Sequence, residues 1–189
     1  MRKLIISEFI TLDGVIQAPG AVDEDTDGGF AHGGWVARNW DDGIGAGFSE
    51  VIADVDAVLF GRRTYVEHAE AFEPNPAEDP FGDVAHYVVS TTLTAPIWRK
   101  TTIIRDNIVE SIRALKAQPG KTILTDGSSQ LTHLLFTHDL VDELRLYVFP
   151  LIVGGGKRLF PDGKMAGFSL VSSKPLPNGV LILHYARRA

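Results

Sequence analysis

The feature that most constrains this fold is the alternation of short apolar runs with helical patterns over the first two thirds of the chain. The runs AVLFG and KTILT have the length and composition of buried strands, and a helical pattern follows each of them closely. Strand patterns then follow one another without helices between them: ELRLYVFPLIV, FSLVSS and VLILHYA. This order predicts an α/β domain with a mainly parallel central sheet, helices on both faces and an antiparallel C-terminal edge.

Between the first strand, Lys3 to Thr11, and the next helical pattern lies a long segment from Gln17 to about Gly47. It is rich in Gly and Asp and shows neither the strand nor the helix period, so we interpret it as an ordered functional loop. The motif GIGAG within it has the wrong spacing for a dinucleotide fingerprint and does not follow a strand. We therefore expect a flexible loop there.

Composition narrows the classes of function. The chain has 189 residues, 44% of them hydrophobic, which fits one domain over residues 1–189. It has no cysteine, and its histidines lack metal-site spacing, so we expect no metal. The net charge of −6 and the lack of a long apolar run argue against nucleic-acid and membrane partners. We interpret the protein as cytoplasmic, with any anionic ligand held by local groups.

Such local groups occur at two junctions between a strand and a helix. In LFGRRTY, Gly61 lets the backbone pass close to a ligand, and Arg62 and Arg63 stand at the helix opening. In LTDGSSQL, Gly127 and Ser128 offer donors without bulk. Anions bind at such helix starts, and two of them on one sheet can hold the two ends of a dinucleotide. Alternatively, Gly61 only forms a tight turn and Ser128 only caps a helix.

Taken together, these motifs resemble a known family. A strand ending in TLDGVIQ, the two junctions, and the run LVDELRLYVFPLIVGGGKRLF are similar to the dihydrofolate reductase fold. The closest resemblance is to the reductase domain of the bacterial bifunctional deaminase-reductase of riboflavin biosynthesis and to its free-standing relatives. It covers nearly the whole chain and is most specific from Asp126 to Phe160. The glycines of GGGKRLF suit close backbone approach to a ligand or a contact between subunits.

The resemblance implies that NADPH lies across the carboxyl edge of the sheet. Arg62 and Arg63 would meet its 2′-phosphate or pyrophosphate, which favours NADPH over NADH. Fold relatives join two glycines by a cis peptide where this chain has Gly127 and Ser128, so a cis bond stays open here. The implied cofactor site comprises Phe9, Val15, Ile16, Gly61, Arg62, Arg63, Thr64, Ser90, Thr91, Asp126, Gly127, Ser128, Ser129, Gln130 and Leu131.

The substrate side is less defined. Asp13 begins the lid that the resemblance implies, and Asp42 and Glu50 flank the position near Gly45 where folate-reducing members carry a proton-donating carboxylate. These three carboxylates are the candidate catalytic residues. Trp35 and Trp40 are candidates for stacking on a planar heterocycle, although aromatic residues there serve equally for packing.

The resemblance thus implies an NADPH-dependent reductase of a small heterocycle that functions as a homodimer. The leading substrate is 5-amino-6-(5-phosphoribosylamino)uracil. A dihydrofolate-type or general carbonyl reductase is the alternative among enzymes. A nucleotide-binding or assembly module without catalytic activity is the alternative from a different class.

Overall fold

The structure, a computed structural model, describes residues 1–188. In that range the strands are β1 (Leu4–Thr11), β2 (Val55–Gly61), β3 (Ala85–Val89), β4 (Thr101–Ile104), β5 (Thr122–Asp126), β6 (Glu143–Phe149), β7 (Phe168–Pro175) and β8 (Leu181–Arg187). The α-helices are α1 (Asp42–Ile52), α2 (Arg62–Phe72), α3 (Ile108–Ala117) and α4 (Ser129–Thr137). Short 3-10 turns lie at Asp27–Gly29, Ala37–Asn39 and Pro76–Glu78.

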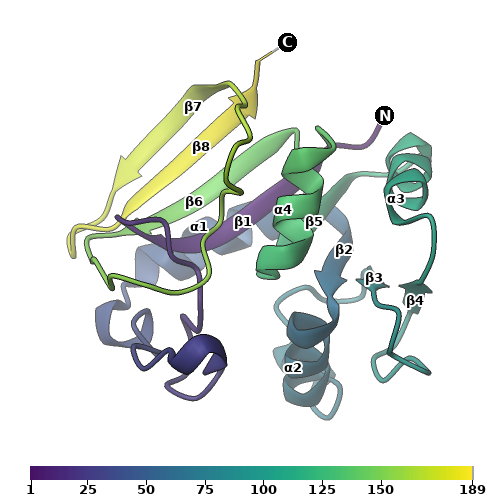
Figure 1. The fold of residues 1–189 in the computed structure, drawn as a ribbon, viewed down its shortest axis with the longest axis horizontal. Coiled ribbons are helices and arrows are strands. Elements are labelled where there is room, and N and C mark those ends of the chain that lie inside the picture. The colour runs from purple at the N-terminus through teal and green to yellow at the C-terminus, as the bar shows by residue number, and fades with distance from the viewer. Residues whose placement is uncertain (189) are drawn as a thin grey trace.

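All of these strands join one sheet in the order β4-β3-β2-β5-β1-β6-β8-β7 (Figure 1). The pairs from β4 to β6 are parallel. β8 is antiparallel to β6, and β7 is antiparallel to β8. The predicted mainly parallel sheet with an antiparallel C-terminal edge is confirmed.

Helices cover both faces of the parallel part, as predicted. On one face, Leu4 and Ile6 of β1 pack in a core with residues of α3 and α4. On the other face, Ile5 of β1 packs in a core with residues of α1 and α2. Side chains that alternate along β1 therefore contribute to two separate cores, which is why Leu4, Ile5 and Ile6 are apolar in succession. Figure 1 shows α4 in front of the sheet and α1 behind it.

The segment GIGAG is helical, so the prediction of a flexible loop is wrong. α1 begins at Asp42, after Asp41 has capped it by accepting a hydrogen bond from the Gly43 N–H at 2.8 Å. The glycines let this helix lie close to its neighbours, because a Cβ at Gly43 would come 2.6 Å from Leu176 and one at Gly47 2.9 Å from Ile182. The sequence shows the glycines but not the surface against which they pack.

Candidate functional site

A cleft of about 720 Å³ lies at the carboxyl edge of the sheet. Its lining comes from the carboxyl ends of β1, β2, β3 and β5, the first turns of α2 and α4, and the loop that follows β1. Parallel strands that alternate with helices bring these ends together on one edge, where α/β proteins bind their ligands. The two junctions between a strand and a helix that the sequence singles out therefore share one cleft.

Ser128 ties the two helix starts to each other. Its Oγ accepts a hydrogen bond from the Gly61 N–H at 2.8 Å and donates one to Thr64 Oγ1 at 2.9 Å. A Cβ at Gly61 would come 2.9 Å from Ser128 Oγ, and one at Gly127 would come 3.0 Å from Thr64 Cγ2. The small residues are therefore required where the two turns meet, and their size is explained by this contact, whereas the sequence alone suggested a ligand as the reason.

Neither helix start carries a side-chain cap. Gly61 is the N-cap of α2, and Ser128, in the left-handed conformation at φ 70°, is the N-cap of α4 without a capping hydrogen bond from its side chain. First-turn N–H groups that no cap satisfies, together with the positive end of each helix dipole, make this rim suitable for an anion. The peptide bond between Gly127 and Ser128 is trans, since the described residues contain no cis peptide.

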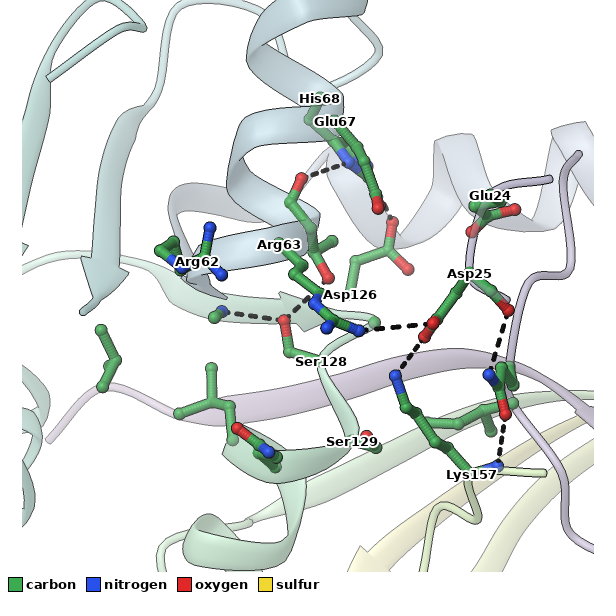
Figure 2. A pocket seen from close by; sticks show the side chains of 18 of the residues that line it. Glu24, Asp25, Arg62, Arg63, Glu67, His68, Asp126, Ser128, Ser129 and Lys157 are labelled. Carbon is green, nitrogen blue, oxygen red and sulfur yellow. Dashed lines mark hydrogen bonds and ion pairs between the residues drawn. The ribbon is translucent and has the colours of Figure 1, made fainter. Parts of the chain in front are cut away.

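The charged side chains at this rim form an ionic network (Figure 2). Arg63 pairs with Asp27 and, at 3.4 Å, with Asp25. Lys157 pairs with both carboxylates as well, at 3.0 Å from Asp27. Hydrogen bonds from Arg63 and Lys157 lower the pKa of Asp27 to about 2. Arg62 lines the same cleft and makes no ion pair within residues 1–188, so it is the guanidinium that is free for a ligand.

Next to the helix starts, the cleft has an acidic side. Glu8, on β1, is 4% exposed, and its Oε1 has no hydrogen-bond partner in the described part of the chain. Burial raises the pKa of Glu8 well above its usual value, and the nearby charge of Asp126 adds to this rise, while the Gly127 N–H opposes it. Burial and the charge of Glu24 similarly raise the pKa of Glu67 on α2.

His68 connects α2 to the end of β5. Its Nδ1 lies 2.9 Å from the Thr64 carbonyl oxygen, and its Nε2 lies 3.8 Å from Asp126 Oδ2 (Figure 2). Burial acts to lower the pKa of His68, but the hydrogen bond and the charge of Asp126 outweigh it, so the pKa is raised. When its imidazole is protonated, His68 therefore neutralises the charge of Asp126, which is one carboxylate of the acidic side.

Most residues of the cofactor site implied by the resemblance line this cleft. Ser90 is nearly buried, and its Oγ accepts hydrogen bonds from the Thr92 and Leu93 N–H groups, so part of its capacity serves the turn after β3. The structure brings together Phe9, Ile16, Gly61, Arg62, Arg63, Thr64, Ser90, Thr91, Asp126, Gly127, Ser128, Ser129, Gln130 and Leu131.

Val15 and Asp13 are not among the lining residues. Val15 is fully buried beneath the loop, where it packs with Ala18 and Phe30. Asp13 accepts hydrogen bonds from Thr11 Oγ1 at 2.6 Å and from the Gly154 N–H at 2.9 Å, so it joins the end of β1 to the GGGKRLF loop. Its contacts are those of a structural residue.

The structure does not bring the other candidates for chemistry into the cleft either. Asp42 and Glu50 are exposed at opposite ends of α1. Trp35 is 3% exposed, donates a hydrogen bond from Nε1 to the Gln17 carbonyl at 3.0 Å, and packs edge-on against Phe149. Trp40 is 52% exposed and does not line the cleft. Packing, the alternative considered for the tryptophans, therefore describes Trp35.

Sequence reasoning missed the acidic side and part of the ionic network. Glu8 had a recognisable signal, because it occupies the same face of β1 as Leu4 and Ile6 and is thus a carboxylate at an inward position. The other missed residues gave no local signal, since they lie in an aperiodic loop, on the second turn of α2, or beyond the glycines of the C-terminal part: Gln17, Glu24, Asp25, Asp27, Glu67, His68 and Lys157.

In residues 1–188, no group of three or more His, Asp or Glu side chains is arranged to hold a metal ion. Within the same range, none of the helices has the length and apolar character needed to cross a membrane.

Comparisons with known proteins agree with this architecture. The family profile of the RibD C-terminal domain matches residues 2–182. The uncharacterized protein YyaP of Bacillus subtilis is 30% identical over 195 residues, covering 97% of this chain and 94% of YyaP. The uncharacterized protein YwjB of the same organism is 27% identical over 160 residues, covering 84% of this chain and 83% of YwjB.

Solved structures share the fold. A putative riboflavin biosynthesis protein from Shewanella sp. PV-4 superposes with a TM-score of 0.71 at 21% identity, over 99% of both chains. A pyrimidine reductase-like protein from Corynebacterium diphtheriae gives a TM-score of 0.66 at 12% identity, over 100% of this chain and 92% of the other. Dihydrofolate reductase from Enterococcus faecalis, complexed with NADP(H) and RAB-propyl, gives 0.65 at 15% identity, over 99% and 97%.

Proposed function

Because the chain belongs to the RibD C-terminal domain family, a family of reductases, we propose that it is an NADPH-dependent oxidoreductase of a small heterocyclic substrate. The observation that carries this proposal is the joining of two uncapped helix starts in one cleft, with Arg62 at the opening of the first. A dinucleotide phosphate needs such a rim, because it presents several acceptor oxygens close together.

The residues present fit a dinucleotide. Backbone N–H groups at the starts of α2 and α4 would bind the pyrophosphate, and Arg62 would meet a further phosphate. The apolar side chains of Val89, Ile108 and Leu134 line the cleft beside Thr91 and would cover an adenine ring. When bound, NADPH supplies the hydride for the reduction. The chain's own part is to orient both reactants and to exclude water from the cleft.

The substrate in this proposal is a nitrogen heterocycle held beside Phe9 and Ile16, toward the acidic side of the cleft. The pyrimidine 5-amino-6-(5-phosphoribosylamino)uracil is the first compound to test, because one fold relative is described as a riboflavin biosynthesis protein and another as pyrimidine reductase-like. Its phosphate would have to lie away from Glu24 and Glu67, since like charges repel.

Thermal unfolding with and without nucleotide tests the cofactor. At a hundredfold excess over its dissociation constant, NADPH stabilises the protein by about 2.7 kcal/mol, which corresponds to a rise in Tm of about 5 to 10 °C for a chain of this size. We expect a smaller rise with NADH. The Arg62→Ala variant should reduce the NADPH shift, whereas Arg113→Ala, on the exposed side of α3, should not.

No shift with either nucleotide would reject the proposal and favour a module without catalytic activity. If NADPH binds, its oxidation is followed by absorbance with the aminouracil phosphate and, in parallel, with dihydrofolate. Turnover of the first supports the proposed substrate, and turnover of dihydrofolate alone replaces it by the folate alternative. Binding without turnover of either rejects both substrates while keeping the cofactor.

We further propose that the protein acts in the cytoplasm as a homodimer that pairs through its C-terminal edge. The absence of cysteine is compatible with a reducing compartment. β7 is an edge strand, and Leu170 and Val171 on it are 54% and 56% exposed, which is unusual for apolar side chains on an unpaired edge. Light scattering after gel filtration should give the mass of two chains, and the mass of one chain would reject the dimer.

A further inference from the structure

Glu24, Glu67 and Asp126 line one part of the cleft, and we refer to them together as the acidic recess. They come from the loop after β1, from the second turn of α2 and from the end of β5. Figure 2 shows Glu67 and His68 on α2 next to Asp126, with Glu24 on the facing loop. The recess adjoins the helix starts to which the proposed function assigns the cofactor phosphates, so the cleft has two parts of different charge.

Of the cationic side chains that line the cleft, only His68 pairs with a member of the recess within residues 1–188, through its contact with Asp126, and Glu24 and Glu67 have no ion pair there. Arg63 and Lys157 pair with Asp25 and Asp27, and in residues 1–188 neither of them has an ion pair with Glu24 or Glu67. Glu24 accepts hydrogen bonds from the backbone N–H groups of Gly20 and Ala21, which hold the carboxylate without changing its charge.

A second, independent observation comes from the floor of the cleft. Glu8 lines it, is 4% exposed, and carries a buried Oε1 that no donor within residues 1–188 satisfies. Buried polar atoms without a partner are uncommon, and at a binding site they mark a place where a ligand can supply the missing donor or charge. Glu8 lines the same cleft as the recess, and the charges of Asp126 and Glu24 both raise its pKa, so two members of the recess lie close to its carboxyl group.

We propose that the acidic recess binds a positively charged, N–H-rich group of the substrate, such as an amidinium or an ammonium on a heterocycle, and disfavours a phosphate. This inference rests on the proposed function and narrows its substrate class to heterocycles with a cationic N–H group, which the neutral ring of the aminouracil does not carry. A planar amidinium presents N–H groups on two sides, so it can reach carboxylates that come from different elements, as Glu24 and Glu67 do. Burial raises the pKa of Glu8 and of Glu67, and a neighbouring carboxylate adds to each rise, although His68 and Arg63 partly oppose it at Glu67.

Benzamidine and benzamide test the inference, because they share a ring and a shape while only benzamidine carries a charge. Their dissociation constants are measured by isothermal titration calorimetry at low ionic strength, with and without NADPH. We expect benzamidine to bind about tenfold more tightly than benzamide. Glu67→Gln should reduce that preference to about threefold or less, and Glu8→Gln should reduce it as well. The matched control Glu70→Gln, exposed on the same helix but outside the lining, should leave the preference unchanged.

Equal binding of benzamidine and benzamide would overturn the inference, and so would a preference that survives both Glu67→Gln and Glu8→Gln. Tighter binding of phenyl phosphate than of benzamidine would also overturn it. Displacement of benzamidine by millimolar Mg²⁺ would overturn it as well, because the recess would then be a site for a metal cation. The calorimetric titration without NADPH tests the acidic recess alone. Thermal unfolding with NADPH tests the proposed cofactor. A failure of this inference can therefore be distinguished from a failure of the proposed function.

Discussion

Replacing Ser128 by alanine tests whether one hydroxyl couples the two helix starts. The change removes the acceptor of the Gly61 N–H at 2.8 Å and the donor to Thr64 Oγ1 at 2.9 Å, while the Cβ that fills the gap beside Gly61 stays. Two partly buried hydrogen bonds of this kind are together worth about 1 to 2 kcal/mol, since the Gly61 N–H loses its partner. We therefore expect Tm to fall by about 2 to 8 °C.

Ser129→Ala is the matched control, because Ser129 lines the same cleft and its hydroxyl makes no hydrogen bond within residues 1–188. It should change the free energy of unfolding by less than about 0.5 kcal/mol. In a Thr64→Val background the effect of Ser128→Ala should shrink, because the two hydroxyls share a bond. Ser128→Ala with unchanged stability but weakened NADPH binding would refute the reasoning, since the hydroxyl would then serve the ligand and not the contact between the helices.

Three other changes address the glycine, the arginines and the buried acid. Gly127→Ala should destabilise by about 1 to 2 kcal/mol in urea, because φ is +69° and the new Cβ would meet Thr64 at 3.0 Å; an unchanged midpoint would contradict this. Arg62→Ala should weaken NADPH binding about tenfold, and Arg63→Ala much less, because Arg63 is already paired; the reverse order in a fluorescence titration would exclude Arg62 as the phosphate ligand. Glu8→Gln should raise Tm at pH 8 and have little effect near pH 4. The pKa of Glu8 is higher in the folded than in the unfolded protein, so Glu8 contributes to stability below its unfolded pKa, and this contribution is lost as the pH rises through its folded pKa. A difference in Tm between Glu8→Gln and the unchanged protein that does not vary with pH would contradict this.

The sheet and its edge could be predicted because periodicity and element order are local properties of the sequence. AVLFG and the centre of KTILT, Ile123 and Leu124, are apolar because β2 and β5 lie between helices on both faces, and this is what a buried parallel strand requires. The meeting of the two helix starts in one cleft followed from the same logic, because Gly61 and Gly127 stand where strands meet helices. The physical reason for the glycines could not be derived, since the contact between residues 61 and 128 spans 67 positions.

The acidic side could not be predicted because its residues are far apart in sequence and most follow no period. Glu24 and Glu67 line one cleft only because the loop after β1 comes close to the start of α2, and an aperiodic loop does not show which of its side chains turn inward. Trp35 illustrates the same difficulty, since it is an aromatic residue in that loop which turned into the core. Glu8 is the exception, because a carboxylate on an inward position of a buried strand is visible in the sequence.

The ionic network explains why the two parts of the cleft are not independent. Asp25 and Asp27 hold the loop to Arg63 and Lys157, and the same loop carries Glu24 into the acidic recess. A phosphate that drew Arg63 away from these carboxylates would leave them to Lys157 alone and would shift the loop that positions Glu24. Because Arg63 and Asp27 are both about half exposed, this pairing is worth little and is screened by salt, so such an exchange is within reach of an incoming ligand. The loop between β1 and α1 therefore connects Arg63, at the start of α2, with Glu24 in the acidic recess.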